Sequence, residues 1–162
     1  MIINRQRAIR VPIRTLEKFL ARAMKALRLP QDAAAVCFVT SSQITKWNKA
    51  YRGKSKPTDV LSFPGGDDSG PKDTLRRRGR RIRNKFLTSA TPFPSSISYL
   101  GDIAIAPAVA RQNARLYGRA LEDEMRILIL HGLLHLMGYD HETDTGQMDR
   151  REKRLRRILG IS

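Results

Sequence analysis

Cysteine is almost absent from this sequence, which contains one residue of this type, Cys37. One cysteine cannot build a disulfide framework or a cysteine-rich zinc finger, so both of these classes are excluded. Cys37 lies in the apolar run Ala-Val-Cys-Phe-Val, whereas a catalytic thiol needs a polar, electropositive setting. We therefore expect Cys37 to be a buried core thiol.

Long hydrophobic runs are missing as well. The most apolar stretch, from Ile127 to Met137, contains two histidines and is too short to span a bilayer. The N-terminal residues Met1-Ile-Ile-Asn-Arg lack the apolar stretch of a secretory signal peptide. The sequence thus predicts a cytoplasmic protein with no membrane partner.

Acidic residues are few relative to basic ones. The chain has 31 lysines and arginines against 15 aspartates and glutamates, a net charge of +16. A folded domain with this charge repels itself, and the usual reason for it is a polyanionic partner, most often nucleic acid. A basic host proteome is the alternative. Aromatic residues make up 6%, so no base-stacking platform is evident, and the candidates are assigned mostly to the core: Tyr51, Phe63, Phe86, Phe93 and Tyr99.

Apolar periodicity predicts one α+β domain covering residues 1–162, with a small mixed sheet of about four strands packed with about five helices. Pro107 suits the first position of a helix that Gly118 closes, and Gly138 suits the cap of a long central helix. Strands are expected at 2–11, 33–40, 58–63 and 99–106. Helices are expected at 16–27, at 41–51 with Ser41 or Ser42 as the cap, at 107–118 and at 121–137. The last helix follows a capping box of Asp144 and Gln147 and turns Met148, Leu155, Ile158 and Leu159 inward.

Residues 67–98 differ from the rest of the chain in composition. Asp, Ser, Gly, Pro and Arg dominate, and the run from Arg76 to Arg81 is nearly pure charge. Such a segment has little packing capacity, so it is predicted to be a basic loop insert within the domain. A run of this kind is usually a solvated surface. If the partner is nucleic acid, it and the stretch from Arg150 to Arg157 are expected to contact phosphates.

Histidine is confined to one place. All three histidines of the chain lie within His131-Gly-Leu-Leu-His135-Leu-Met-Gly138-Tyr-Asp140-His141. His131 and His135 are four residues apart on the predicted central helix, so their rings share one face. A positive φ at Gly138 would turn the chain back and bring His141 up as a third ligand. Three protein ligands leave a fourth zinc position for water, which is the catalytic arrangement; copper, nickel and iron also accept imidazole.

The same histidine offsets occur in the metzincin proteases, His-Glu-x-x-His-x-x-Gly-x-x-His. Gly132 stands here where those proteases carry the glutamate that acts as general base. Asp140 and Glu142 are nearby, but neither is at the protease position. The metal site therefore resembles that of a protease, and the catalytic machinery does not.

The histidine segment resembles the signature of the YbeY family of bacterial endoribonucleases. Two further blocks are similar to that family: the residues from Asn48 to Pro64, which include Arg52, and Leu100-Gly-Asp102-Ile-Ala-Ile. Three blocks in the same order make the resemblance specific, and it covers nearly all of the chain outside 67–98.

The resemblance implies a single-strand-directed, metal-dependent endoribonuclease. It implies action in ribosomal RNA maturation, notably at the 3′ end of 16S rRNA on the small ribosomal subunit, and in ribosome quality control. It also implies one zinc ion per chain, held by His131, His135 and His141, and a part in activity for Arg52. A guanidinium can grip a phosphate with two parallel hydrogen bonds, although a lone arginine is more often a solvated surface residue.

The roles of two aspartates stay open in the sequence, and so do two other functions. Asp59 and Asp102 can each orient a ligating imidazole or cap a turn beside a strand. A metallopeptidase is favoured by the histidine offsets and opposed by Gly132 and the charge of +16. A non-catalytic, zinc-containing ribosome-assembly factor is opposed by the lack of a fourth Cys or His ligand.

Overall fold

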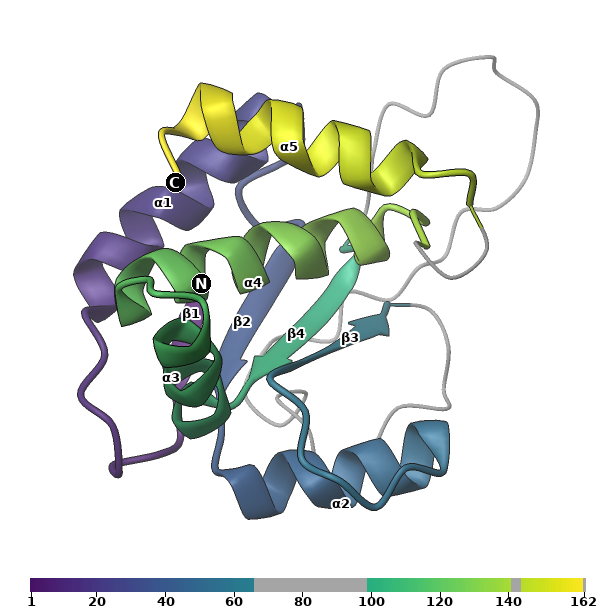
Figure 1. Cartoon of the computed structure of the whole chain (residues 1–162). Coiled ribbons are helices and arrows are strands. Elements are labelled where there is room, and N and C mark those ends of the chain that lie inside the picture. Colours follow the sequence, from purple (N-terminus) through teal and green to yellow (C-terminus); the bar gives the residue numbers. More distant parts are fainter. Residues whose placement is uncertain (66–98, 141–143, 162) are drawn as a thin grey trace.

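A mixed four-stranded sheet forms the centre of the computed structural model, which describes residues 1–65, 99–140 and 144–161 (Figure 1). The strands are β1 (Ile2–Asn4), β2 (Ala34–Phe38), β3 (Val60–Pro64) and β4 (Gly101–Ile105), in the order β1-β2-β4-β3. β1, β2 and β4 are parallel, whereas β3 runs antiparallel to β4 at the edge of the sheet. The predicted basic insert at 67–98 lies outside the described residues.

Five helices of the described chain surround this sheet. They are α1 (Ile13–Ala26), α2 (Ser41–Arg52), α3 (Pro107–Leu116), α4 (Leu121–Leu136) and α5 (Gln147–Leu159). Figure 1 shows α4 and α5 on one face of the sheet with α1 beside them, and α2 on the opposite face. The predicted α+β architecture is confirmed. No helix in the described ranges is long and apolar enough to cross a bilayer.

The strand register explains why the core has two halves. Val36 lies opposite Ile103 and Cys37 lies opposite Ala104, and successive side chains of a strand point to opposite faces. Val36 and Ile103 join the core cluster formed with α1, α4 and α5. Cys37 and Ala104 join a second cluster with Ile44 and Trp47 of α2. The sheet is thus buried on both faces, and α4 is the central helix of the larger half.

Two expectations at the chain's early elements are wrong. β1 ends at Asn4 instead of continuing to residue 11, because the side chain of Gln6 bonds the backbone N–H and carbonyl of Ile9 and folds the chain into a turn. The cap of α2 is Thr40 and neither Ser41 nor Ser42. The Thr40 hydroxyl accepts a hydrogen bond from the Gln43 backbone N–H at 3.2 Å.

The start of α5 also differs from expectation. Asp144 does accept backbone N–H groups there, from Gly146, Gln147 and Met148, and these bonds, that from Met148 foremost, lower the pKa of its carboxyl. The capping position itself is occupied by Gly146, so the predicted capping box is wrong in detail. Ile158 is 60% exposed instead of buried, whereas Met148, Leu155 and Leu159 are buried as predicted.

Candidate metal centre

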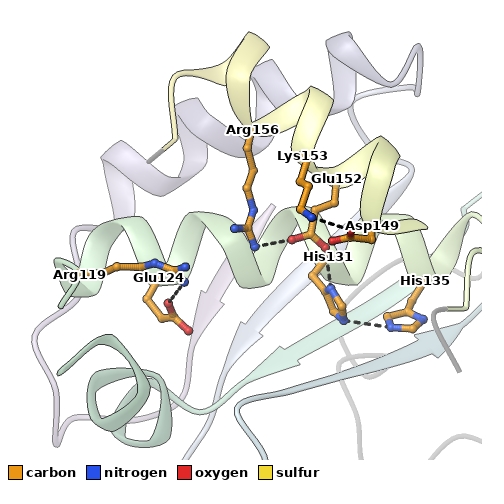
Figure 2. A network of polar contacts seen from close by, with 8 residues as sticks. All are labelled: Arg119, Glu124, His131, His135, Asp149, Glu152, Lys153 and Arg156. Carbon is orange, nitrogen blue, oxygen red and sulfur yellow. Dashed lines mark hydrogen bonds and ion pairs between the residues drawn. The ribbon is translucent and has the colours of Figure 1, made fainter. Parts of the chain in front are cut away.

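Two imidazole rings face one another near the C-terminal end of α4. His131 and His135 lie one turn apart, with ring centroids 4.7 Å apart and planes inclined at 76°. Their Nε2 atoms are 3.1 Å apart (Figure 2). The predicted helical placement of both residues is therefore confirmed, and the spacing of four residues brings the two Nε2 atoms close enough to bind one ion.

The geometry of this pair fits a shared zinc ion. Two nitrogens that bind zinc tetrahedrally at roughly 2.0–2.1 Å would lie about 3.3 Å apart. The observed Nε2 separation of 3.1 Å is close to that value. Neutral imidazole nitrogens are also among the commonest zinc ligands. The donor set and its spacing are thus suited to the ion that the sequence predicts.

A carboxylate from α5 fixes the outer nitrogen of His131. Glu152 Oε2 lies 2.8 Å from His131 Nδ1, and Figure 2 shows the Glu152 carboxylate between His131 and Arg156. An ionised carboxylate only accepts hydrogen bonds, so Nδ1 carries the proton and Nε2 keeps its lone pair for a ligand. Arg156, one turn along α5, donates to the other oxygen of the same carboxylate.

Glu152 is charged although it is 8% exposed. Burial of its carboxyl acts to raise the pKa, but the hydrogen bonds with His131 and Arg156 and the positive charge of Arg156 outweigh burial and lower it. Glu152 is not among the site residues that the sequence predicts. A signal was present, because Glu152 shares the inward face of α5 with Met148 and Leu155, where a lone acid needs a partner.

The turn after α4 begins as predicted. Gly138 has a φ of +89°, and its N–H donates to the His135 carbonyl at 2.9 Å. His141 lies outside the described residues, so its predicted place as a third ligand stays a prediction. Among residues 1–65, 99–140 and 144–161, no group of three or more His, Cys, Asp or Glu side chains is arranged to hold a metal ion.

Gly132 allows α4 to approach the sheet closely. A Cβ at this position would lie 2.7 Å from Cγ2 and 2.9 Å from Cδ1 of Ile103 on β4, which overlaps with a fully buried, β-branched side chain. The Ser62 hydroxyl of β3 also donates to the Gly132 carbonyl. The position that carries the general base in metzincin proteases is therefore filled by strand contacts and has no room for a glutamate.

Comparison with known proteins identifies the family. The family model described as Endoribonuclease YbeY matches residues 1–160. This chain belongs to the YbeY family. YbeY proteins similar to it include that of Sulfurovum sp., 32% identical over 98% of this chain and 90% of the relative. That of Koribacter versatilis is 35% identical over 99% and 86%. A solution structure of a Thermotoga maritima protein aligns with a TM-score of 0.56 at 25% identity, over 99% of this chain and 90% of that one.

The other residues of the YbeY-like blocks come from different layers. Arg52 is the exposed last residue of α2, on the face of the sheet opposite α4 (Figure 1). Asp59 has a structural role: its Oδ1 accepts from the Val60 N–H at 2.8 Å, and its Oδ2 accepts from Asn113 of α3 at 2.9 Å. Asp102 accepts a hydrogen bond from the Tyr99 hydroxyl.

Cys37 is the buried thiol that the sequence of this YbeY protein predicts. Its side chain is 1% exposed, and burial is the main cause that raises the pKa of the thiol to about 11. A thiol with that pKa is neutral and poorly nucleophilic at neutral pH. Cys37 therefore belongs to the core and not to the chemistry.

Proposed function

We propose that this chain is a zinc-dependent endoribonuclease that cleaves single-stranded RNA. We propose further that it acts in late ribosome maturation, at the 3′ end of 16S rRNA, and in ribosome quality control. Family membership supports an RNA-cleaving activity, because the relatives carry the description endoribonuclease. The observation that carries the metal-dependent part is the Nε2 pair of His131 and His135, with Glu152 on the outer nitrogen of one ring.

The ligands that we assign are His131, His135 and His141, with one zinc per chain. When bound, zinc supplies a Lewis acid and an activated water. The Glu152 carboxylate keeps the proton of His131 on Nδ1, so that Nε2 faces the site. Arg156 holds the same carboxylate from its other side and prevents it from turning away.

Arg52 is the residue that we assign to the phosphate. Cleavage of a phosphodiester builds negative charge on the phosphate oxygens, and a guanidinium can offset that charge through two parallel hydrogen bonds. Peptide hydrolysis is disfavoured, because the contact of Gly132 with Ile103 leaves no place for the protease base. The net charge of +16 also favours a polyanionic substrate over a peptide.

The test is cleavage of a short single-stranded RNA by the purified protein, before and after treatment with a chelator. We expect chelation to abolish cleavage and added zinc to restore it. Arg52→Ala should keep zinc and fold while losing most of its activity. Arg52→Lys should recover a part, because an ammonium cannot reproduce the planar contact.

Two outcomes would contradict this proposal. Cleavage that persists in chelator, with contaminating nucleases excluded, would remove the metal from the reaction. Zinc-loaded protein that binds RNA without cutting it would favour the non-catalytic assembly factor. A peptide substrate serves as the control, and no version of the protein should cut it.

A further inference from the structure

A hollow of about 370 Å³ lies between the end of α1 and the outer side of α5. Buried Leu27 and Leu155 form its floor, and exposed Ile158 adds an apolar wall. Three exposed arginines complete the lining: Arg28, Arg151 and Arg154. The volume falls within the range of small-ligand sites, roughly 300–1,000 Å³. An apolar floor under three positive groups suits an anionic ligand that also has an apolar face.

Arg28 is an unexpected residue at its position. α2, α3, α4 and α5 are each followed by a glycine of positive φ, namely Gly53, Gly118, Gly138 and Gly160. At the end of α1 the same left-handed position is taken by Arg28, with a φ of +59°, and it is the one non-glycine residue of positive φ in the described ranges. A side chain there costs about 1 kcal/mol relative to glycine. The chain accepts this strain at a residue that lines the hollow.

The three arginines are not engaged by carboxylates in the described parts of the chain. Other arginines are paired: Arg119 with Glu124, Arg126 with Glu122 and Asp123, and Arg156 with Glu152. Of the three arginines, Arg151 makes a cation–π contact instead: its guanidinium carbon lies 5.7 Å from the centroid of the Tyr139 ring. The hollow thus presents guanidinium groups that no carboxylate of the described residues neutralises and that can bind an anion.

Neighbouring residues of α5 face the hollow and the candidate metal centre. Glu152 turns toward His131, while its neighbour Arg151 lines the hollow. Arg151 also contacts Tyr139, which lies four residues after His135 and two before His141. One helix therefore places an anchor for the histidine and a lining residue of the hollow side by side.

We propose that this hollow binds a nucleotide of the substrate strand outside the cleavage site. The arginines hold its phosphate, and its base or sugar packs on Leu27, Leu155 and Ile158. This inference rests on the proposed function, because it assumes an RNA substrate. Phosphate is favoured over a carboxylate ligand because three arginines line one hollow and the apolar floor suits a base face. An acidic protein segment is the competing occupant.

The test compares the zinc-loaded protein with two variants that each remove two positive charges. The double variant, Arg28→Gly combined with Arg154→Ala, removes two positive charges from the lining of the hollow. The control, called the α3 control, is Arg111→Ala combined with Arg115→Ala, since both are exposed residues of α3 that do not line the hollow. Arg28→Gly relieves the positive φ, so thermal stability should be unchanged or higher, and weaker binding cannot be attributed to misfolding.

The measurements are cleavage kinetics on a single-stranded RNA of about 20 nucleotides, which is long enough to reach the hollow, and on one of about 4 nucleotides, which is not. An oligoglutamate peptide serves as competitor. For the long RNA we expect the double variant to raise KM about 10-fold with kcat within twofold. The slope of log(1/KM) against the logarithm of the salt concentration should become shallower by about 0.7 for each lost phosphate contact. KM for the short RNA should not change, and the α3 control should stay near the parent on both RNAs.

Each contrary result points to one cause. If the double variant and the α3 control have the same KM on the long RNA while the parent cleaves it, the inference about the hollow is wrong and the proposed function stands. A second contrary result is that oligoglutamate displaces labelled RNA from the parent at a lower concentration than unlabelled RNA does, and fails to do so with the double variant. In that case the occupant is an acidic protein segment. If the parent cleaves neither RNA, the proposed function has failed first.

Discussion

Glu152 shows how a residue far along the chain completes the candidate site. The two histidine ligands on α4 are predictable, because a spacing of four on a helix places both rings on one face. Glu152 is 21 residues from His131, and its contact depends on how α5 packs against α4. No pattern of the linear sequence encodes that packing angle. The position of Arg52 relative to the histidines is unpredictable for the same reason, since it depends on the stacking of layers.

Glu152→Gln should weaken zinc binding by about 10-fold, within the roughly 10–100-fold range for partners of metal-ligating histidines. The amide removes the negative charge that holds the proton on His131 Nδ1 while keeping the size of the side chain. Competition with a chromophoric chelator measures the affinity. Asp149→Asn is the matched control, because Asp149 lies on the same helix and pairs with the exposed Lys153. Equal zinc affinity in both variants would show that the Glu152 contact is structural only.

At the scale of elements, helix ends were easier to predict than strand ends. α4 was expected at 121–137 and spans Leu121–Leu136, since a glycine follows it closely. β1 was expected to reach residue 11 but ends at Asn4, because alternation alone does not reveal the Gln6 turn. The helical period predicts that Ile158 is buried, yet it is exposed and lines the hollow beside α1. Periodicity predicts which face of a helix is apolar but not how far the neighbouring helix covers it.

The close contact of α4 with β4 gives a prediction at this scale. Gly132→Ala should lower the free energy of unfolding by about 1–3 kcal/mol, because its methyl group would overlap with Ile103. Urea denaturation measures the change. Ile103→Ala removes all three contacting carbons, so in that background the same Gly132→Ala change should cost clearly less. An equal cost in both backgrounds would mean that the close contact does not determine the choice of glycine.

For the whole molecule, composition predicts the chemical class of the partner but not which surface binds it. The charge of +16 by itself indicates a polyanionic partner. The described residues then separate arginines that pair with acids, such as Arg126 and Arg156, from those that line the hollow. Sequence alone could not make that distinction, because it requires the positions of the carboxylates.

The basic segment is expected to contribute to RNA affinity. Residues 72–88 contain eight lysines and arginines, so their deletion should weaken RNA binding and make its dependence on salt shallower as phosphate contacts are lost. Titration of a single-stranded RNA at several salt concentrations measures both quantities. Circular dichroism should show an intact fold. A deletion variant with the parental salt slope would assign the segment to the solvated surface.

The most direct test of the central claim is zinc content measured together with RNA cleavage in the parent and in His135→Ala. We predict about one zinc per parent chain, held by imidazoles in the arrangement of catalytic zinc sites, and cleavage of single-stranded RNA. We predict loss of both in His135→Ala, because the remaining ligands bind the ion far more weakly. A parent without stoichiometric metal would contradict the metal centre. His135→Ala protein that cleaves RNA at the parental rate would contradict the nuclease mechanism and favour the assembly-factor alternative.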